Sequence, residues 1–344
     1  MTTTSHPATV SAPPESTTMS AIVQREYGDS AVLRLKAISI PAITDDEVLI
    51  RVHAAGVNHA DWVSTTGEPL IGRLAFGLRR PKQPVRGRDV AGVIHAVGPA
   101  VTRFRPGDAV YGELDTGTFA EYAAAPERAV ALKPANLTFE QAAVVPLSAR
   151  TALQGLTIAD DVRPDSHVLI NGASGGVGTF AVQIAKSLGA EVTAVCSARN
   201  AELARSLGAD HVIDYTETDF TTGAERYDVI FDSIGNHSLS RLRGVLTRRG
   251  TLVLSSGTGG RVLGPMGRIL QALLMTPFVS QTLRTFTSGL PLDRITELVE
   301  AGEVTPVIER AYPLAETGQA IRHFAERHAR AKIVIRVTPD AERR

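Results

Sequence analysis

A glycine-rich turn in the middle of the chain has the residue types and spacing of a phosphate-binding turn. It occupies residues 173–178 (ASGGVG), after an apolar run at 168–170 that predicts a buried strand and before a helical pattern that ends at Gly189. Gly175 would let the backbone approach a pyrophosphate closely, and Gly178 would let the helix pack tightly on the strand. Ala173 stands at the first glycine of the usual pattern. The residues expected to contact a dinucleotide are Ala173, Ser174, Gly175, Gly176, Val177 and Gly178. A glycine turn of another α/β fold is the alternative.

The end of the next strand indicates which dinucleotide binds. The strand is predicted at 191–196, and residues 197–200 contain Ser197 and Arg199 but no Asp or Glu. A carboxylate here would accept from the ribose 2′-hydroxyl of NAD, whereas a hydroxyl and a guanidinium suit a 2′-phosphate. NADPH (NADP) is therefore expected rather than NADH. The alternative for Arg199 is an ordinary solvated residue at the start of a helix.

Composition and charge are those of a globular chain with two domains. The chain has 344 residues, of which 43% are hydrophobic and 21% charged. Its formal net charge is zero, which argues against nucleic acid or an anionic membrane as the main partner. The single cysteine, Cys196, excludes a disulfide framework and fits a reducing compartment. No segment has the apolar length of a transmembrane helix, so membrane insertion is not expected.

The N-terminal residues differ in composition from the rest of the chain. Residues 1–18 are rich in Ser, Thr and Pro and nearly free of apolar residues, which predicts a disordered tail. The tail has no arginine and no apolar core, so neither a secretory signal nor a mitochondrial transit peptide is expected. Together with the reduced cysteine, this predicts a cytoplasmic location.

Two patterns of predicted elements divide the chain. From residue 20 to residue 147 short strands and turns follow one another, which indicates an antiparallel, partly open β-barrel. Beyond residue 147 strands alternate with helices, which indicates a parallel sheet. A last strand pair, at 304–308 and 331–337, returns to the barrel. The expected strands of the parallel sheet are 168–170, 191–196, 211–214, 229–233 and 251–255. The expected domains are 19–147 with 304–344, and 148–303.

Several motifs in a fixed order carry a resemblance to a known family. They are AGVNHAD at 55–61, GRDVAG at 87–92, FRPGD at 104–108, GTFAEY at 117–122, ASGGVG at 173–178 and LGADHVIDY at 207–215. On these motifs the chain resembles the medium-chain dehydrogenase/reductase superfamily, in its zinc-free quinone oxidoreductase (zeta-crystallin-like) branch, from residue 20 to residue 337. The resemblance implies an α/β fold, in which a GroES-like β-barrel catalytic domain is joined to a Rossmann domain with a doubly wound parallel sheet.

The zinc positions of the family hold residues of other kinds in this chain. A catalytic zinc needs about three protein ligands and an open position. The zinc-dependent relatives use a Cys, a His and a second Cys, and the resemblance places Asn58, Arg88 and Leu147 at those positions. No metal is therefore expected. Without a Lewis acid to polarise an alcohol or ketone oxygen, the expected acceptor is a small hydrophobic molecule that takes hydride readily, a quinone or an α,β-unsaturated carbonyl.

Few side chains of the barrel half belong to a sequence pattern that is typical of catalytic groups. No Ser–His–Asp, paired-carboxylate or Tyr-x-x-x-Lys arrangement has a convincing context. Asn58 could donate a hydrogen bond to a developing oxyanion, or it could be a turn residue that bonds its own backbone. Asp61 and Asp89 are interpreted as structural residues that bond neighbouring loops.

The resemblance implies further contacts with the cofactor. Thr151 matches the threonine that lies under the nicotinamide, and with Asn58 it is the expected catalytic pair. Lys332 lies near the C-terminal lysine of the family, although the glycine before that lysine is Ala331 here. The expected cofactor contacts outside the turn are Ser197, Arg199, Tyr215, Ser233, Ile234, Gly235, Ser255, Ser256 and Lys332.

Two segments are expected to determine the choice of acceptor. Residues 62–84 form a loop with apolar and basic residues, and residues 258–290 are more apolar than a surface segment needs. The second segment could cover a hydrophobic acceptor, or it could form a dimer contact or core packing, and we expect a homodimer. Three classes of function stay open: an NADPH-dependent reductase of quinones or activated alkenes, an NAD(P)-dependent alcohol dehydrogenase, and a non-catalytic nucleotide-binding protein.

Overall fold

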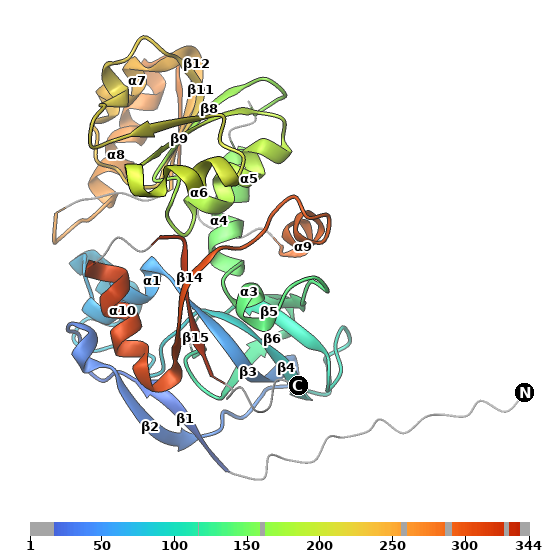
Figure 1. Cartoon of the computed structure of the whole chain (residues 1–344). Coiled ribbons are helices and arrows are strands. Elements are labelled where there is room, and N and C mark those ends of the chain that lie inside the picture. Colours follow the sequence, from blue (N-terminus) through green and yellow to red (C-terminus); the bar gives the residue numbers. More distant parts are fainter. Residues whose placement is uncertain are drawn as a thin grey trace, which may run out of the picture.

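Two large sheets organise the molecule, one in the upper and one in the lower half of Figure 1. The computed structural model describes residues 17–115, 117–158, 162–255, 260–285, 291–326 and 330–337. The upper sheet has the strand order β10-β9-β8-β11-β12-β13, and the lower one has the order β14-β15-β3-β4-β5-β7, with β6 paired to β3. Within these ranges no helix combines the length and the apolar character that a membrane crossing needs.

The upper sheet is parallel throughout. Its strands are β8 (His167–Asn171), β9 (Glu191–Cys196), β10 (His211–Asp214), β11 (Tyr227–Asp232), β12 (Leu246–Leu254) and β13 (Thr282–Thr285). The strands predicted at 191–196 and 211–214 are confirmed to the residue, and the others are confirmed with shifted ends. The short edge strand β13 is not predicted by the sequence pattern. Because β8 lies between β9 and β11, the direction of winding reverses at the carboxyl end of β8, which is where ligands bind in open α/β sheets.

Helices cover this sheet and connect it to the lower half. They are α4 (Pro146–Ile158), α5 (Gly178–Ser187), α6 (Ala201–Ser206), α7 (Leu239–Gly244), α8 (Met266–Met275) and α9 (Asp293–Glu300). Phe180 and Ile184 of α5 are fully buried in the core cluster that includes Val168 and Ile170 of β8. Burying such a side chain contributes about 1.5–3 kcal/mol, so this contact fixes α5 on the sheet. Gly189 has φ +82° just beyond α5, which confirms the predicted end of the helix.

The lower sheet is antiparallel except for β14 and β15, which pair in parallel. Its strands are β3 (Glu47–Val57), β4 (Asp89–Val97), β5 (Ala109–Glu113), β6 (Tyr122–Pro126), β7 (Val130–Leu132), β14 (Ile308–Pro313) and β15 (Lys332–Arg336). A separate pair is formed by β1 (Thr18–Val23) and β2 (Arg34–Ser39). The helices of this half are α1 (His59–Thr66), α2 (Arg73–Phe76), α3 (Phe139–Ala143) and α10 (Thr317–Glu326).

The strand predicted at 304–308 is wrong. Residues 304–307 have no regular structure, and β14 begins only at Ile308. Pro306 has no N–H to donate to a ladder, and Val304 is buried in the core from a loop rather than from a strand. The apolar pattern at 304–308 therefore reflects burial in the core and not a strand.

The end of the predicted N-terminal tail is displaced. Residues 1–16 lie outside the described residues, but Thr18 already pairs with Ser39, so the chain is ordered at the end of the stretch predicted as a disordered tail. The start of β1 depends on pairing with β2, about 20 residues later in the chain, which the composition of the tail does not show.

One buried core runs through both halves of the molecule. A single cluster contains Ala54 and Tyr111 of the lower sheet together with Phe180 and Val253 of the upper half. The hydroxyl of Tyr111 on β5 lies 2.8 Å from Thr296 Oγ1 on α9, and burial raises the pKa of Tyr111 to about 12. This packing determines where residues of the lower half stand relative to the turn before α5.

Candidate functional site

The glycine-rich turn connects β8 to α5, and its backbone lies close to β9 and to the start of α5. The N–H groups of Gly172 and Ala173 donate to the carbonyl oxygen of Val195 on β9 over 3.2 and 3.1 Å. A Cβ on Gly178 would lie 2.1 Å from the carbonyl oxygen of Gly172, so only glycine fits there. A Cβ on Gly175 would meet only that same oxygen, at 3.3 Å. The fold itself therefore requires Gly178, whereas the space in front of Gly175 is open to a ligand.

Asn200 ties this turn to the end of β9. It is 5% exposed, and its Nδ2 donates to Ser174 Oγ over 3.0 Å and to Ser197 Oγ over 3.4 Å. Arg199, one residue earlier, is exposed in the short helix that follows β9. The structure thus brings Ser197 and Arg199 to the border of the turn. Sequence reasoning missed Asn200, for which the only signal is an amide side chain shortly after the strand.

The loop after β11 lies against the same turn. Ser233 Oγ donates to the carbonyl oxygen of Asn171 over 2.7 Å. The N–H groups of Ile234 and Gly235 donate to Asp232 Oδ1 over 3.2 and 2.9 Å. These bonds hold residues 233–235 at the carboxyl ends of β8 and β11, next to the turn.

The remaining predicted contacts come from the ends of the flanking strands. Tyr215 follows β10, is 55% exposed, and donates its N–H to the carbonyl oxygen of Cys196 over 3.2 Å. Ser255 follows β12 and donates its N–H to the carbonyl oxygen of Asp232 over 3.1 Å. Ser256 lies outside the described residues. The structure therefore gathers the described residues of the upper half that are predicted to contact the cofactor at one edge of the sheet.

Asp232 connects this edge to α8. Its carboxylate is fully buried, accepts from Asn171 Nδ2 over 2.8 Å and lies 2.5 Å from a terminal nitrogen of Arg268. Arg268 also donates to the carbonyl oxygen of His237 over 2.8 Å. Breaking a buried ion pair by removing one partner costs about 3–5 kcal/mol. The pair, which sequence reasoning missed, therefore anchors α8 beside the edge where the predicted cofactor contacts gather.

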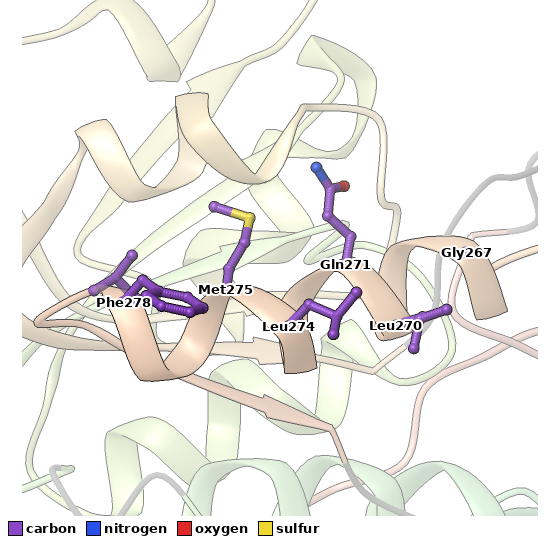
Figure 2. Close-up of a pocket in the computed structure, with 7 residues that line it drawn as sticks. Gly267, Leu270, Gln271, Leu274, Met275 and Phe278 are labelled. Carbon is purple, nitrogen blue, oxygen red and sulfur yellow. The ribbon is translucent and has the colours of Figure 1, made fainter.

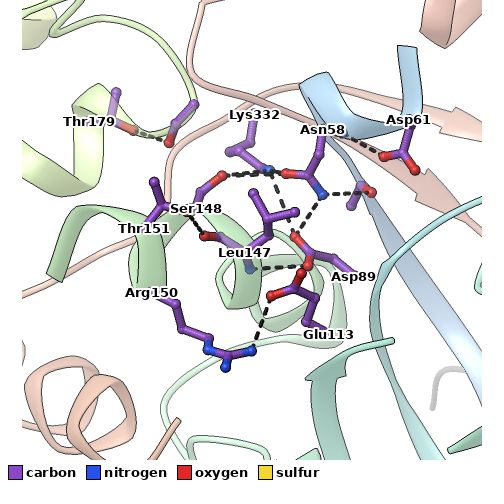
Figure 3. A network of polar contacts seen from close by, with 12 residues as sticks. Asn58, Asp61, Asp89, Glu113, Leu147, Ser148, Arg150, Thr151, Thr179 and Lys332 are labelled. Carbon is purple, nitrogen blue, oxygen red and sulfur yellow. Dashed lines mark hydrogen bonds and ion pairs between the residues drawn. The ribbon is translucent and has the colours of Figure 1, made fainter. Parts of the chain in front are cut away.

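A second group of polar side chains is buried in the lower half, next to the turn (Figure 3). Lys332 Nζ donates to Asn58 Oδ1 over 2.5 Å and to Ser148 Oγ over 2.9 Å, and it lies 3.9 Å from Asp89 Oδ2. Asn58 Nδ2 donates to Asp89 Oδ2 over 2.9 Å. The N–H of Leu147 donates to Asp89 Oδ1 over 3.1 Å. Lys332, Asn58, Ser148 and Asp89 are each at most 3% exposed, and we call these four residues the lysine cage.

Burial shifts the pKa values of the ionisable groups in and beside the cage. It raises the pKa of Asp89 to about 7, although the Lys332 ammonium opposes this shift. Burial also lowers the pKa of Lys332, against the attraction of Asp89. Asp61 accepts from the Asn58 N–H over 2.8 Å, and burial raises its pKa to about 6. Carboxyl groups that titrate near neutral pH in the interior are typical of functional sites.

Glu113 extends the network towards α4. Its two carboxylate oxygens pair with Arg88 and Arg150, each over 3.1 Å. Thr151, the next residue on α4, is half-buried and donates its hydroxyl to the carbonyl oxygen of Leu147 over 2.7 Å. Figure 3 shows Thr151 and Leu147 on the same side of α4 as the cage. The structure therefore brings both predicted catalytic residues, Asn58 and Thr151, into one region.

Residues 331 and 332 connect the turn to the cage. The N–H of Ala331 donates to the carbonyl oxygen of Ser174 over 2.8 Å. A Cβ on Gly176 would lie 3.1 Å from Lys332 Cδ and 3.7 Å from Ser148 Oγ. Lys332 thus lies beside the turn, but its ammonium is bonded inside the cage, and its contact with the cofactor stays a prediction.

Comparisons with known proteins agree with this geometry. The family model of the alcohol dehydrogenase GroES-like domain matches residues 44–135, and that of zinc-binding dehydrogenase matches residues 207–335. The chain is 36% identical to the mitochondrial NAD(P)H oxidoreductase RTN4IP1 of Bos taurus, over 94% of this chain and 90% of that protein. The chain is a medium-chain dehydrogenase/reductase.

Other relatives of this medium-chain dehydrogenase/reductase carry related names. The chloroplastic NADPH-dependent alkenal/one oxidoreductase of Arabidopsis thaliana is 34% identical over 93% of this chain and 80% of that protein. The solved structure of the quinone oxidoreductase from Coxiella burnetii superposes with a TM-score of 0.81 at 27% identity, and covers 93% of this chain and 100% of that one. These similarities support the quinone oxidoreductase branch of the family.

In this medium-chain dehydrogenase/reductase, the positions that correspond to zinc ligands converge on Asp89. Asn58 and Leu147 each donate to its carboxylate, and Arg88 is its neighbour in the chain. The donor set does not suit a metal ion, because Leu147 side-chain carbons have no lone pair and Lys332 adds a positive charge. Over the described ranges of the chain, no three His, Cys, Asp or Glu side chains are grouped to hold a metal ion.

The two segments expected to determine acceptor choice meet in the structure. The N–H groups of Leu70 and Ile71 donate to the carbonyl oxygens of Arg261 and Val262 over 2.8 and 3.0 Å. Arg261 also pairs with Glu68 over 2.7 Å. These contacts, which we call the clasp, join the loop after α1 to the segment before α8. The clasp therefore links the two halves of the medium-chain dehydrogenase/reductase in addition to the shared core.

Proposed function

We propose that this medium-chain dehydrogenase/reductase is an NADPH-dependent reductase that transfers hydride to a quinone or an α,β-unsaturated carbonyl without a metal ion. The observation that carries the proposal is the lysine cage. It is buried beside the turn, and in it the Lys332 ammonium bonds Asn58, which the resemblance places at a zinc-ligand position. The printed names of the relatives, NAD(P)H oxidoreductase and NADPH-dependent alkenal/one oxidoreductase, support the same reaction class.

The dinucleotide would be held by the turn and the strand ends. The start of α5 and the space in front of Gly175 suit a pyrophosphate, because backbone N–H groups there favour negative charge. Ser197 and the exposed Arg199 suit the 2′-phosphate of NADPH, since a guanidinium binds phosphate through two parallel hydrogen bonds. When bound, the reduced dinucleotide supplies the hydride. The chain's own task is to position the partners and exclude water.

The acceptor would bind between the cage and the clasp segments. Asn58 would donate to the acceptor oxygen as negative charge develops on it. A quinone or an enone spreads that charge over a conjugated system and so does not require a Lewis acid, whereas a simple ketone does not share this advantage. The clasp contains the apolar residues Leu70, Ile71 and Val262, which would suit such acceptors.

Steady-state oxidation of NADPH tests the proposal. The assay uses a quinone, an enal and a simple ketone, each with and without a strong chelator. We expect turnover with the quinone or the enal, no loss of rate with chelator, and little turnover with the ketone. Ketone reduction that collapses with chelator would establish a metal-dependent alcohol dehydrogenase instead. Binding of NADPH without turnover of any acceptor would favour a non-catalytic nucleotide-binding protein.

We also propose that the chain forms a homodimer through α8. Figure 2 shows Leu270, Leu274 and Phe278 along the pocket that α8 and the residues after it line. These side chains are 58%, 65% and 87% exposed, which is unusual for so many large apolar residues in one segment. The strand β13 follows this segment in the chain and forms one edge of the upper sheet. Sedimentation of Leu274→Glu should show a monomer, whereas Leu132→Glu, at an exposed leucine of β7, should stay dimeric like the native chain; a native monomer would contradict the proposal.

The cytoplasmic location stays a prediction. The names of the Bos taurus and Arabidopsis thaliana relatives place those proteins in the mitochondrion and the chloroplast. Fluorescence microscopy of the full chain with a C-terminal tag would test the location directly. A diffuse signal is expected, and a signal confined to an organelle would contradict the prediction.

A further inference from the structure

We infer that the ammonium of Lys332 takes the place of a metal ion as the fixed positive charge of this site, and that Lys332 is a positioning residue for Asn58. The inference rests on the proposed function, because positioning Asn58 affects catalysis only if Asn58 faces the acceptor. It differs from the role that the resemblance implies, in which Lys332 contacts the dinucleotide.

The contacts of Lys332 show where its ammonium is directed. An ammonium has three N–H donors. Two of them reach Asn58 Oδ1 over 2.5 Å and Ser148 Oγ over 2.9 Å, and Asp89 Oδ2 lies 3.9 Å away. The residue is 2% exposed. The charge is therefore bonded within the lower half of the molecule and is not presented to the turn.

The surrounding charges make Lys332 the partner of one carboxylate. Asp89 is fully buried, and within the part of the chain that the structure describes no arginine pairs with it, whereas Glu113 pairs with both Arg88 and Arg150. A buried carboxylate is costly unless a charge of opposite sign lies nearby. In zinc-dependent relatives a divalent ion would supply that charge among the corresponding positions. Here Lys332 supplies it.

The cage leaves Asn58 only one favourable orientation of its amide. The oxygen Oδ1 accepts from the Lys332 ammonium, and Nδ2 donates to Asp89. A flipped amide would place its NH₂ group against the ammonium and its oxygen against the carboxylate, so both bonds would become repulsive. The second N–H of the amide has only the carbonyl oxygen of Gly56, at 3.5 Å. That long contact leaves this N–H available to an acceptor oxygen.

The cage also lies against the turn that would bind the dinucleotide. Ala331 bonds the carbonyl oxygen of Ser174, and Lys332 Cδ lies where it would be 3.1 Å from a Cβ on Gly176. The stem of Lys332 therefore passes directly behind the turn. This placement explains how one residue connects the cofactor region to Asn58 without being a cofactor ligand.

Paired substitutions test the inference. Lys332→Met keeps the length of the side chain but removes the charge, and Asp89→Asn removes the charge that it balances. We expect Lys332→Met to lower both the thermal midpoint and kcat for the enal or quinone, kcat by roughly 100-fold, with the Kd for NADPH changed less than about threefold. The double variant Lys332→Met/Asp89→Asn should regain thermal stability but not kcat. The matched control is Lys186→Met, at a lysine of α5 that pairs with Asp210 over 2.7 Å and lies outside the site; its kcat should stay unchanged.

Two kinetic outcomes would overturn the inference. If the double variant regains kcat together with stability, Lys332 serves only to neutralise Asp89. If Lys332→Met raises the Kd for NADPH more than tenfold with kcat unchanged, Lys332 is a ligand of the dinucleotide instead.

A measurement without substrate separates this inference from the proposed function. The side-chain amide signals of Asn58 in ¹⁵N NMR spectra, assigned with Asn58→Asp, should show slow hydrogen exchange in the native chain. They should exchange at least tenfold faster in the double variant. Equal exchange in both would refute the positioning role even if the enzyme is active. An inactive native chain with the expected exchange difference would refute the proposed function alone.

Discussion

Ala331 donates its backbone N–H to the carbonyl oxygen of Ser174 over 2.8 Å, and it does so in a left-handed conformation with φ +60°. This bond joins the start of β15 to the glycine-rich turn, so that the residue after Ala331 enters the lysine cage. The resemblance implies a glycine at this position, and the observed conformation is one that favours glycine. The chain keeps the geometry with alanine at some cost in stability.

Ala331→Gly should therefore stabilise the protein. A left-handed conformation costs a residue with a Cβ about 1–2 kcal/mol, and glycine removes this cost. Glycine also loses more conformational entropy on folding than alanine, which offsets about 0.5–1 kcal/mol of the stabilisation. We expect the free energy of unfolding to rise by about 0.5–1 kcal/mol in urea denaturation. The control is Ala311→Gly on the neighbouring strand β14, which should lower it by a similar amount. A destabilised Ala331→Gly would show that the backbone at 331 is not strained.

Gly178→Ala and Gly175→Ala should separate folding from cofactor binding. The Cβ at 178 would lie 2.1 Å from a backbone oxygen, so we expect destabilisation of about 1–3 kcal/mol. The Cβ at 175 has a single neighbour at 3.3 Å, so Gly175→Ala should fold normally but bind NADPH more than about tenfold more weakly in fluorescence titration. Gly244→Ala on α7, where a Cβ would meet nothing within 4 Å, is the control. Unchanged NADPH affinity in Gly175→Ala would rule out a pyrophosphate in front of the turn.

Arg199→Ala should change the preference between the two dinucleotides. Loss of a charge-assisted bond to the 2′-phosphate should raise the Kd for NADPH about 10–100-fold, while the Kd for NADH stays within about twofold. Isothermal titration with both dinucleotides measures the ratio. Arg205→Ala, at an exposed arginine of α6, should leave both values unchanged. Equal weakening of NADPH and NADH would remove the phosphate role of Arg199.

Asp61→Asn should reduce the pH dependence of stability. Burial raises the pKa of Asp61 from 3.8 to about 6, so between these values the folded chain holds a proton that the unfolded chain has released. Stability from this group is therefore present at low pH and is lost as pH rises through about 6, by about 3 kcal/mol in total. Asparagine keeps the acceptor for the Asn58 N–H but does not titrate.

Thermal midpoints measured from about pH 4 to pH 7 test this difference. The thermal midpoint of Asp61→Asn should rise relative to that of the native chain as pH increases. Asp46→Asn, at an exposed carboxylate, is the control and should run parallel to the native curve. A constant difference between Asp61→Asn and the native chain would show that Asp61 does not titrate in this range.

Much of the fold follows from local signals in the sequence. The apolar run before Gly172, the turn and the helical spacing up to Gly189 lie within a few residues of one another, so they specify the β8–α5 unit without help from the rest of the chain. The strands at 191–196 and 211–214 contain short apolar runs and follow helices that end at glycines, which made their bounds predictable. The short edge strand β13 has only four residues and a mixed composition, and pairing with β12 alone defines it.

The cage could not be predicted because its parts are far apart in the chain. Lys332 and Asn58 are separated by 274 positions, and Lys332 and Ser148 by 184. The resemblance places Asn58 at a zinc-ligand position, but the sequence does not show which group lies next to it. Asp89, interpreted as structural, is at the centre of the network. Such contacts arise only when the packing of α4 and β15 brings these residues together.

The most direct test of the account follows deuterium from NADPH to an enone. The enzyme is first dialysed against chelator, and its metal content is measured. Single-turnover reaction with NADPH deuterated at C4 should then give a saturated ketone that carries one deuterium at the β-carbon, as mass spectrometry and NMR of the product would show. A metal-free enzyme that transfers no deuterium, and regains transfer only when zinc is added, would contradict hydride transfer without a metal ion.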